Sequence, residues 1–144
     1  MLTSSQLDAL SGARVFLKCE KFQRAGAFKF RGAYHAIARL MSSQASRVFA
    51  TVSSGNHGQG LALACRLQGA IAHLIMPKPF SAMKYRAVLG YGARVHVVDD
   101  RSCADVQLRE IVNDHEAVVV HPFDGTDKVQ IWWGGAAGYE LHKR

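Results

Sequence analysis

The sequence is poor in cysteine, and its cysteines are not spaced for cross-linking or for binding metal. The three of them, at positions 19, 65 and 103, lie far apart and form no Cys-x-x-Cys pair. The seven histidines are scattered as well, without a His-x-x-x-His pair. We therefore expect no disulfide framework and no metal site, and the cysteine usage indicates a reducing, cytoplasmic setting.

Long apolar runs are also absent. No stretch approaches the roughly 18 apolar residues that a membrane-spanning helix needs. The first residues do not combine a basic stretch with an apolar core, so no signal peptide is expected. The hydrophobic fraction of 49% is nevertheless enough for a buried core in a chain of 144 residues.

Acidic residues are outnumbered by basic ones, 11 to 18, which gives a net charge of +7. Such a balance invites a nucleic-acid interpretation. The basic residues are spread singly along the chain, however, and the adjacent pair Lys143-Arg144 comes only at its end. We expect no nucleic-acid partner, and the charge suits small anionic ligands such as phosphates and carboxylates.

Apolar runs of strand type alternate with segments of helical periodicity. Gly69 is placed to end one of these helices and Ser81 to cap the next. This alternation predicts an α/β fold, a parallel sheet of βαβ units with both faces covered. The predicted strands are 15–17, 48–52, 71–76, 94–98 and 117–120, and the predicted helices are 28–41, 56–67, 81–89 and 102–114.

The loop at 53–60, Ser-Ser-Gly-Asn-His-Gly-Gln-Gly, lies between a predicted strand and a predicted helix. Unpaired N–H groups and the positive end of the helix dipole make such a loop an anion site. Its glycines run in the reverse order of the dinucleotide fingerprint, and no Gly-Lys-Ser/Thr follows. The loop therefore suits a carboxylate or a polar ring better than a pyrophosphate.

A second motif, Ala-Gly-Ala-Phe-Lys-Phe-Arg-Gly-Ala at 25–33, surrounds Lys29 with two phenylalanines and small residues. Such a lysine is a candidate for burial, a lowered pKa and imine chemistry. The residue pattern alone leaves open that Lys29 is an ordinary surface lysine. His73, His96 and His121 are interpreted as strand-end histidines with satisfied hydrogen bonds.

The motifs at 27–33 and 53–59, in this order, resemble those of the fold-type II pyridoxal-phosphate enzymes, above all the serine racemases and serine/threonine dehydratases. Segments 16–23, 91–93 and 121–124 add weaker similarities, so the resemblance extends over nearly the whole chain. It implies a tryptophan synthase β-like fold, pyridoxal 5′-phosphate as cofactor and a small amino acid as substrate. The implied reaction is β-elimination or α-proton transfer on a serine- or threonine-type β-hydroxy amino acid.

The resemblance further implies a cofactor-binding and catalytic role for Lys29, which would form the internal aldimine. Phe28 would pack beside the cofactor, and Asn56 would bind the 3′ oxygen of its ring. Asn56 could instead be an Asx-turn residue.

The implied substrate site is the loop itself, which would bind the carboxylate through backbone N–H groups. Ser54 would face the ring opposite Lys29, where racemases of this group have a second acid/base. Both serines of the loop could instead cap the following helix, and His57 is interpreted as structural or as a backbone contributor. The implied substrate-binding residues are Ser53, Ser54, Gly55, Asn56 and His57.

The chain is shorter than the members of the family it resembles. It lacks the family's C-terminal half, with the glycine-rich phosphate loop, the residue opposite the pyridine nitrogen and a carboxylate-lined cation site. The resemblance divides the chain into a partial large domain at 1–47, a small domain at 48–120 and a return into the large domain at 121–144. We expect a fragment with weak or no activity alone.

An apolar segment at 131–138, with Trp132-Trp133, predicts self-association or dependence on the missing half.

Three other functions stay open at this stage. The chain could be a non-catalytic remnant that binds an amino acid or a partner protein. It could also be a synthase that performs β-replacement, although the Ser-Ser-Gly-Asn-His loop favours a dehydratase or racemase. Nucleic-acid binding is a third alternative, which rests on the basic charge alone.

Overall fold

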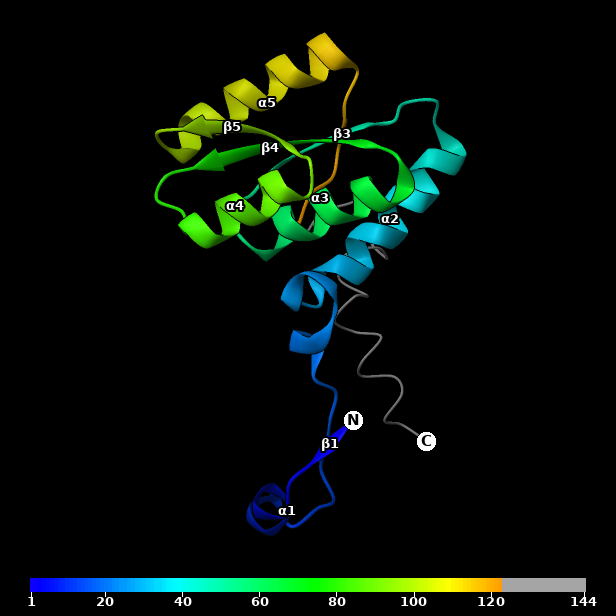
Figure 1. Ribbon diagram of the computed structural model, residues 1–144, viewed down its shortest axis with the longest axis vertical. Coiled ribbons are helices and arrows are strands. Elements are labelled where there is room, and N and C mark those ends of the chain that lie inside the picture. The colour runs from blue at the N-terminus through cyan, green and yellow to red at the C-terminus, as the bar shows by residue number, and fades with distance from the viewer. Residues whose placement is uncertain (123–144) are drawn as a thin grey trace.

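A computed structural model of the chain describes residues 1–122, and its centre is a parallel four-stranded sheet (Figure 1). The strands lie in the order β5-β4-β3-β6, so β6 pairs with β3 on the edge away from β4. This confirms the predicted α/β class and its parallel βαβ units. The bounds of the strands are β3 Val48–Val52, β4 Ile71–Pro77, β5 Arg94–Val98 and β6 Val118–Val119.

Helices cover both faces of this sheet. On one face lie α3 (Asn56–Gln68) and α4 (Ala82–Gly90), with α2 (Lys29–Ser43) packed against α3. On the other face lies α5 (Arg101–His115), seen above the sheet in Figure 1. Each face therefore has its own apolar core, the larger one beneath α2, α3 and α4.

Helix α2 belongs to the larger core, where Phe30 and Ile37 pack with Phe49 and Leu61. The division of the chain into domains at 47 and 120 stays a prediction. The apolar segment at 131–138 lies outside the described residues.

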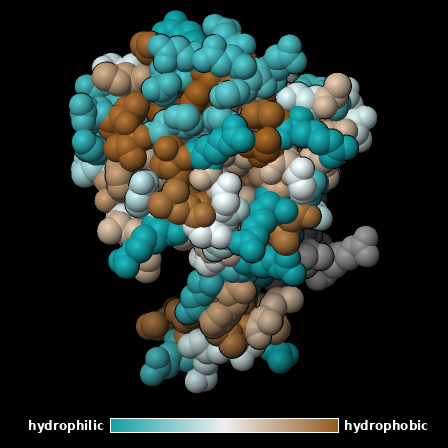
Figure 2. All heavy atoms as spheres, turned by 45° about the horizontal axis from the view of Figure 1, so that its top comes forward, coloured by the Kyte–Doolittle hydropathy of each residue, from teal (hydrophilic) through white to brown (hydrophobic). Residues whose placement is uncertain are grey.

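Residues 1–17 form a small lobe below the sheet in Figure 1, and none of the first 26 residues is buried. Strands β1 (Leu2–Thr3) and β2 (Phe16–Leu17) pair antiparallel around α1 (Ser5–Ser11). Two 3-10 turns, Glu20–Phe22 and Arg24–Gly26, lead from the lobe to α2. Apolar side chains reach its surface, as the lower part of Figure 2 shows; they include Met1, Leu2, Leu7, Leu10 and Phe16.

The predicted element bounds agree closely with the structure. Strands β3 and β5 match the predicted ranges residue for residue, and Gly69 ends α3 with a φ of 68°. The sequence patterns miss strand β1 and helix α1 because so few of their residues contact a core. Ser81 lies at the N-cap of α4, but its side chain makes no capping hydrogen bond.

Three histidines cluster between the sheet and the end of α5. His73 is 1% exposed and its Nδ1 lies 3.1 Å from Nε2 of His96, while the ring of His115 is 4.6 Å away between centroids. The strand-end interpretation is wrong for His73 and His96, which lie inside β4 and β5. The Nε2 of His73 is buried and has no partner among the described residues. His121 is exposed. Burial, together with the charges of His115, His96 and Arg94, lowers the pKa of His73 to about 4.

Within residues 1–122, no helix is long and apolar enough to cross a membrane, and no group of three potential ligands is placed to hold a metal ion.

We predict that stability falls as the pH falls from about 6.5 to about 4. The folded-state pKa of His73 lies below its ordinary value of 6.5, so the unfolded chain takes up the proton first. One such histidine contributes a slope of up to about 1.4 kcal/mol per pH unit in the free energy of unfolding. Urea unfolding at several pH values should show a shallower slope for His73→Gln than for the natural chain. His35→Gln, at an exposed position, is the control, and equal slopes for both variants would contradict the prediction.

Candidate functional site

The carboxyl ends of β3 and β6 form the natural place for a ligand in this sheet. Strands β3, β4 and β5 follow one another in one direction, and the chain then crosses the sheet to place β6 on the opposite side of β3. In open parallel sheets, ligands bind at such a reversal of strand order, beyond the carboxyl ends of the strands. The loop at 53–55 leaves β3 here, and His121 and Pro122 follow β6.

Ser53 organises the loop that follows β3. Its hydroxyl oxygen accepts hydrogen bonds from the backbone N–H of Gly55, at 3.2 Å, and of Gly58, at 3.0 Å. A Cβ atom at Gly58 would lie 3.0 Å from the carbonyl oxygen of Ser53, so a larger residue here would push against the backbone of the loop. The N-cap residue is Gly55, and neither Ser54 nor Asn56 caps the helix with its side chain. Of the predicted capping residues, only Ser53 satisfies the first turn.

The remaining donors of the loop are available to a ligand. The backbone N–H groups of Ser54, Asn56 and His57 have no hydrogen-bond partner among residues 1–122. The side chains of Ser54, which is half-buried, and Asn56, which is exposed, form no hydrogen bonds there either. These groups stand at the positive end of α3 and can receive an anion.

The His57 ring is buried and holds the neighbouring strand. Its Nε2 donates to the carbonyl oxygen of Val120 at 3.0 Å, and its Nδ1 is buried without a partner among the described residues. Burial lowers the pKa of His57 to about 4, and the charges of Lys29 and His121 act in the same direction. His57 is therefore neutral near pH 7, and its ring has a structural role, as the sequence suggested.

The amine of Lys29 reaches the same segment from α2. Lys29 is the first residue of this helix, and its Nζ donates to the carbonyl oxygen of Pro122 at 3.1 Å. The amine also lies 5.2 Å from the centroid of the half-exposed Phe28 ring. Burial removes water from the amine and lowers the pKa of Lys29. A lysine of this kind is more easily deprotonated, as a nucleophilic amine must be.

Gly60 fixes the distance between the two motifs. A Cβ atom at this position of α3 would lie 3.1 Å from the carbonyl carbon of Lys29 and 3.1 Å from the amide nitrogen of Phe30. The backbone of α3 therefore touches the backbone at the start of α2. Helix α3 begins within the 53–57 loop. The contact at Gly60 therefore fixes the start of α2, where Lys29 lies, relative to this loop.

Sequence reasoning misses three residues of this region. It places Gly60 at the end of the 53–60 motif and inside the predicted helix 56–67, but the close approach of Gly60 to Lys29 depends on helix packing that the sequence does not show. Thr51 and Arg101 line a cavity at the end of β3, described below. For Arg101 the sequence gives one signal: it lies in the first turn of a helix, where the helix dipole disfavours a positive charge.

A family model described as "Pyridoxal-phosphate dependent enzyme" matches residues 1–144. An L-threo-3-hydroxyaspartate ammonia-lyase from Pseudomonas sp. is 42% identical over 88% of this chain and 40% of its own length. Maize serine racemase has a TM-score of 0.84 and 34% identity, over 97% of this chain and 42% of that one. A threonine deaminase from T.th. has a TM-score of 0.80 and 34% identity, over 97% of this chain and 44% of that one. The chain thus spans about 40% of the length of the curated relatives it matches.

We predict that Gly60→Ala destabilises the chain although alanine favours helices. The added methyl group meets backbone atoms of Lys29 and Phe30, which cannot rotate away, and overpacking of this kind costs about 1–3 kcal/mol. Gly90→Ala is the matched control, since Gly90 is also helical and a Cβ there meets nothing within 4 Å. Urea unfolding should find Gly60→Ala less stable than Gly90→Ala by about 1–3 kcal/mol. Equal stability would show that the two helices can move apart freely.

Proposed function

The chain belongs to the family of pyridoxal-phosphate dependent enzymes, and from this premise we propose that Lys29 and the 53–57 loop are its cofactor and substrate site. The proposed activity is that of a lyase or racemase acting on a β-hydroxy amino acid. The observation that supports the proposal is the contact at Gly60, because it packs the backbone at Lys29, whose amine is partly desolvated, against the helix that follows the 53–57 loop with its free N–H donors.

The residues present fit an aldehyde cofactor. A primary amine with a lowered pKa is the group that captures an aldehyde, and Lys29 supplies it. Phe28 offers an apolar ring surface 5.2 Å from that amine. Ser54 and Asn56 bring polar side chains with no other hydrogen bond among the described residues, so they remain available to ring or substrate oxygens.

Pyridoxal phosphate, when bound, supplies an electron sink that stabilises negative charge at the substrate Cα. The chain's own residues have three tasks. The N–H groups of Ser54, Asn56 and His57 would bind and orient the substrate carboxylate at the start of α3. The Nζ of Lys29 would take the proton from Cα. Ser54, on the opposite side, would return a proton in a racemase and only orient the substrate in a lyase.

The named relatives support this choice of reaction. They are a hydroxyaspartate ammonia-lyase, a serine racemase and a threonine deaminase, and each is named for an amino acid with a β-hydroxyl group. We extend that substrate class to this chain as part of the proposal. Self-association, predicted from the apolar segments, also remains a proposal, and the exposed apolar side chains of the N-terminal lobe support it.

We predict that the chain captures pyridoxal phosphate covalently through Lys29. Incubation with the cofactor, borohydride reduction and peptide mass mapping should locate a pyridoxyl group on Lys29, with at most a weak signal elsewhere. Lys29→Ala should lose the signal, and the exposed Lys21→Ala should keep it.

A label spread evenly over surface lysines would refute the role of Lys29. Binding of serine or threonine to the chain without any cofactor capture would instead favour the non-catalytic amino-acid-binding alternative.

A further inference from the structure

The three clustered histidines lie outside the candidate site, where the end of α5 meets the sheet. His73 on β4 and His96 on β5 share a hydrogen bond, with 3.1 Å between Nδ1 of His73 and Nε2 of His96. His115, the last residue of α5, lies against His73 with 4.6 Å between the ring centroids. The helix end therefore contacts the sheet through imidazole rings, the side chains whose charge ordinarily changes between about pH 5 and 8.

His73 is the member of the cluster that the fold keeps from water. It is 1% exposed, and its Nε2 is buried without a hydrogen-bond partner among residues 1–122. Protonation of the ring would leave a buried charge and an N–H group there without an acceptor. The hydrogen bond to His96 needs one bare nitrogen, so it is lost when both rings are protonated.

The charged groups that act on His73 are all positive. Burial lowers the pKa of His73 to about 4, and the charges of His115, His96 and Arg94 act in the same direction. Arg94 is the residue of β5 that lies opposite His73 in the strand register. Burial, His115 and Arg94 likewise lower the pKa of His96.

The other elements packed against His73 bring no compensating charge. On this face β3 presents Val48 and Ala50, which are apolar. The acidic residues at the helix end, Asp114 and Glu116, are exposed, and no carboxylate among residues 1–122 contributes to the pKa shift of His73. Protonated imidazoles would therefore repel one another across the contact between α5 and the sheet.

A connection of two residues passes any movement of the helix end to β6. Glu116 follows α5 with a φ of 50°, Ala117 is buried, and β6 begins at Val118. Strand β6 pairs with β3 at only two positions. The connection itself is held by one exposed hydrogen bond, in which the Ser46 hydroxyl donates to the carbonyl oxygen of Glu116 at 2.9 Å.

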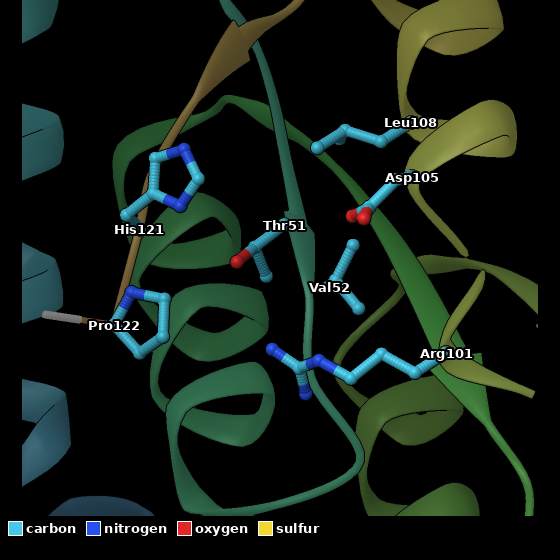
Figure 3. A pocket seen from close by; sticks show the side chains of 7 residues that line it. All are labelled: Thr51, Val52, Arg101, Asp105, Leu108, His121 and Pro122. Atoms are coloured by element: carbon cyan, nitrogen blue, oxygen red, sulfur yellow. The ribbon is translucent and has the colours of Figure 1, made fainter. Parts of the chain in front are cut away.

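The same two elements, α5 and β6, enclose the candidate site. The carbonyl oxygens of Val120 and Pro122, just after β6, accept hydrogen bonds from His57 and Lys29. A cavity of about 170 Å³ lies beside them, between the end of β3 and α5 (Figure 3). Its walls include Thr51 of β3, Arg101, Asp105 and Leu108 of α5, and His121 and Pro122 after β6. Movement of α5 and β6 away from the sheet would open this cavity and withdraw both carbonyl acceptors.

We propose that the histidine cluster is an acid-sensitive switch, in which protonation of His73 releases the end of α5 from β4 and β5 and carries β6 away from the candidate site. The released form exposes His73 to water and separates it from His115, so it binds the proton more tightly than the closed form does. Acid therefore favours release, and the closed form is favoured near pH 7. The switch belongs to the sheet and α5 and does not depend on which ligand the site binds.

The pKa shift sets the steepness of the switch. Because the pKa of His73 is about 4 in the closed form against an ordinary value of 6.5, release is favoured by up to about tenfold for each pH unit between these values.

NMR relaxation dispersion on the 144-residue chain, which measures the population of a minor form, tests the proposal. The reporter is the methyl group of Ile111, buried between α5 and the sheet, and the reference is Ile37 in the core on the other face. We expect the released population at Ile111 to rise at least about tenfold from about pH 7 to about pH 5, without a change at Ile37. The Val120 amide, which donates to Ala50 at 2.9 Å, should report the same population because β6 moves with α5.

Two kinds of variant identify the group responsible. His73→Gln should make the population independent of pH, since glutamine takes up no proton, and the exposed His35→Gln should behave as the natural chain does. At the exposed position 115 the core is left untouched. There His115→Glu should suppress the rise, because a carboxylate attracts protonated His73, and His115→Lys should retain it, although the helix dipole favours lysine at this end.

His57 is the alternative source of an acid step, because its pKa is also lowered to about 4 and its ring holds Val120. A rise that persists in His73→Gln and disappears in His57→Gln would overturn the proposal. So would equal behaviour of His115→Glu and His115→Lys, or equal changes at Ile111 and Ile37, which indicate unfolding of the whole chain. A rise at Ile111 without one at Val120 would refute the link to β6.

Discussion

The contact between the backbone of α3 at Gly60 and the start of α2 at Lys29 is the constraint on which the site depends. It joins the lysine motif and the Ser-Ser-Gly-Asn-His loop, which are separated in sequence by a complete strand. The loop needs no such neighbour for its own shape, because Ser53 already satisfies the N–H groups of Gly55 and Gly58. The helix contact adds position, because it packs the backbone at Lys29 against the helix that begins just after this loop.

The strand order of the sheet explains why so many polar groups meet at one edge. Strand β6 pairs with β3 only through Phe49 and Ala50, and beyond these residues the two segments diverge. The carbonyl oxygens beyond that point are used by side chains, Val120 by His57 and Pro122 by Lys29. Thr51 and Arg101 line a cavity between the ends of the same two strands. One divergence of two strands thus provides both the proposed reaction site and its neighbouring cavity.

Local patterns predict the sheet and its helices because strand and helix periods, caps and glycines are properties of neighbouring residues. Strand β3 and the end of α3 at Gly69 are examples. The residue patterns predict an anion site at the 53–60 loop and a candidate amine at Lys29, and only the resemblance to known motifs joins the two into one site. Contacts such as Gly60 with Lys29, or the place of Arg101 beside Thr51, join residues far apart in the chain. No periodicity records them. In the N-terminal lobe the patterns predict the strand at 15–17 but miss β1 and α1, which contain no buried residue.

The pairing of β6 with β3 costs more chain entropy than the other pairs of this sheet. Strands β3, β4 and β5 are joined by single helical connections, whereas β6 pairs with a strand about 70 residues earlier in the chain. The entropy lost in closing a loop rises with its length, by about 0.6 kcal/mol for each doubling. The β6 side of the candidate site therefore depends on the strand pair whose residues lie farthest apart in the sequence. The hydrogen bonds from His57 and Lys29 to Val120 and Pro122 offset part of that cost, so the polar residues of the site also help to close the fold.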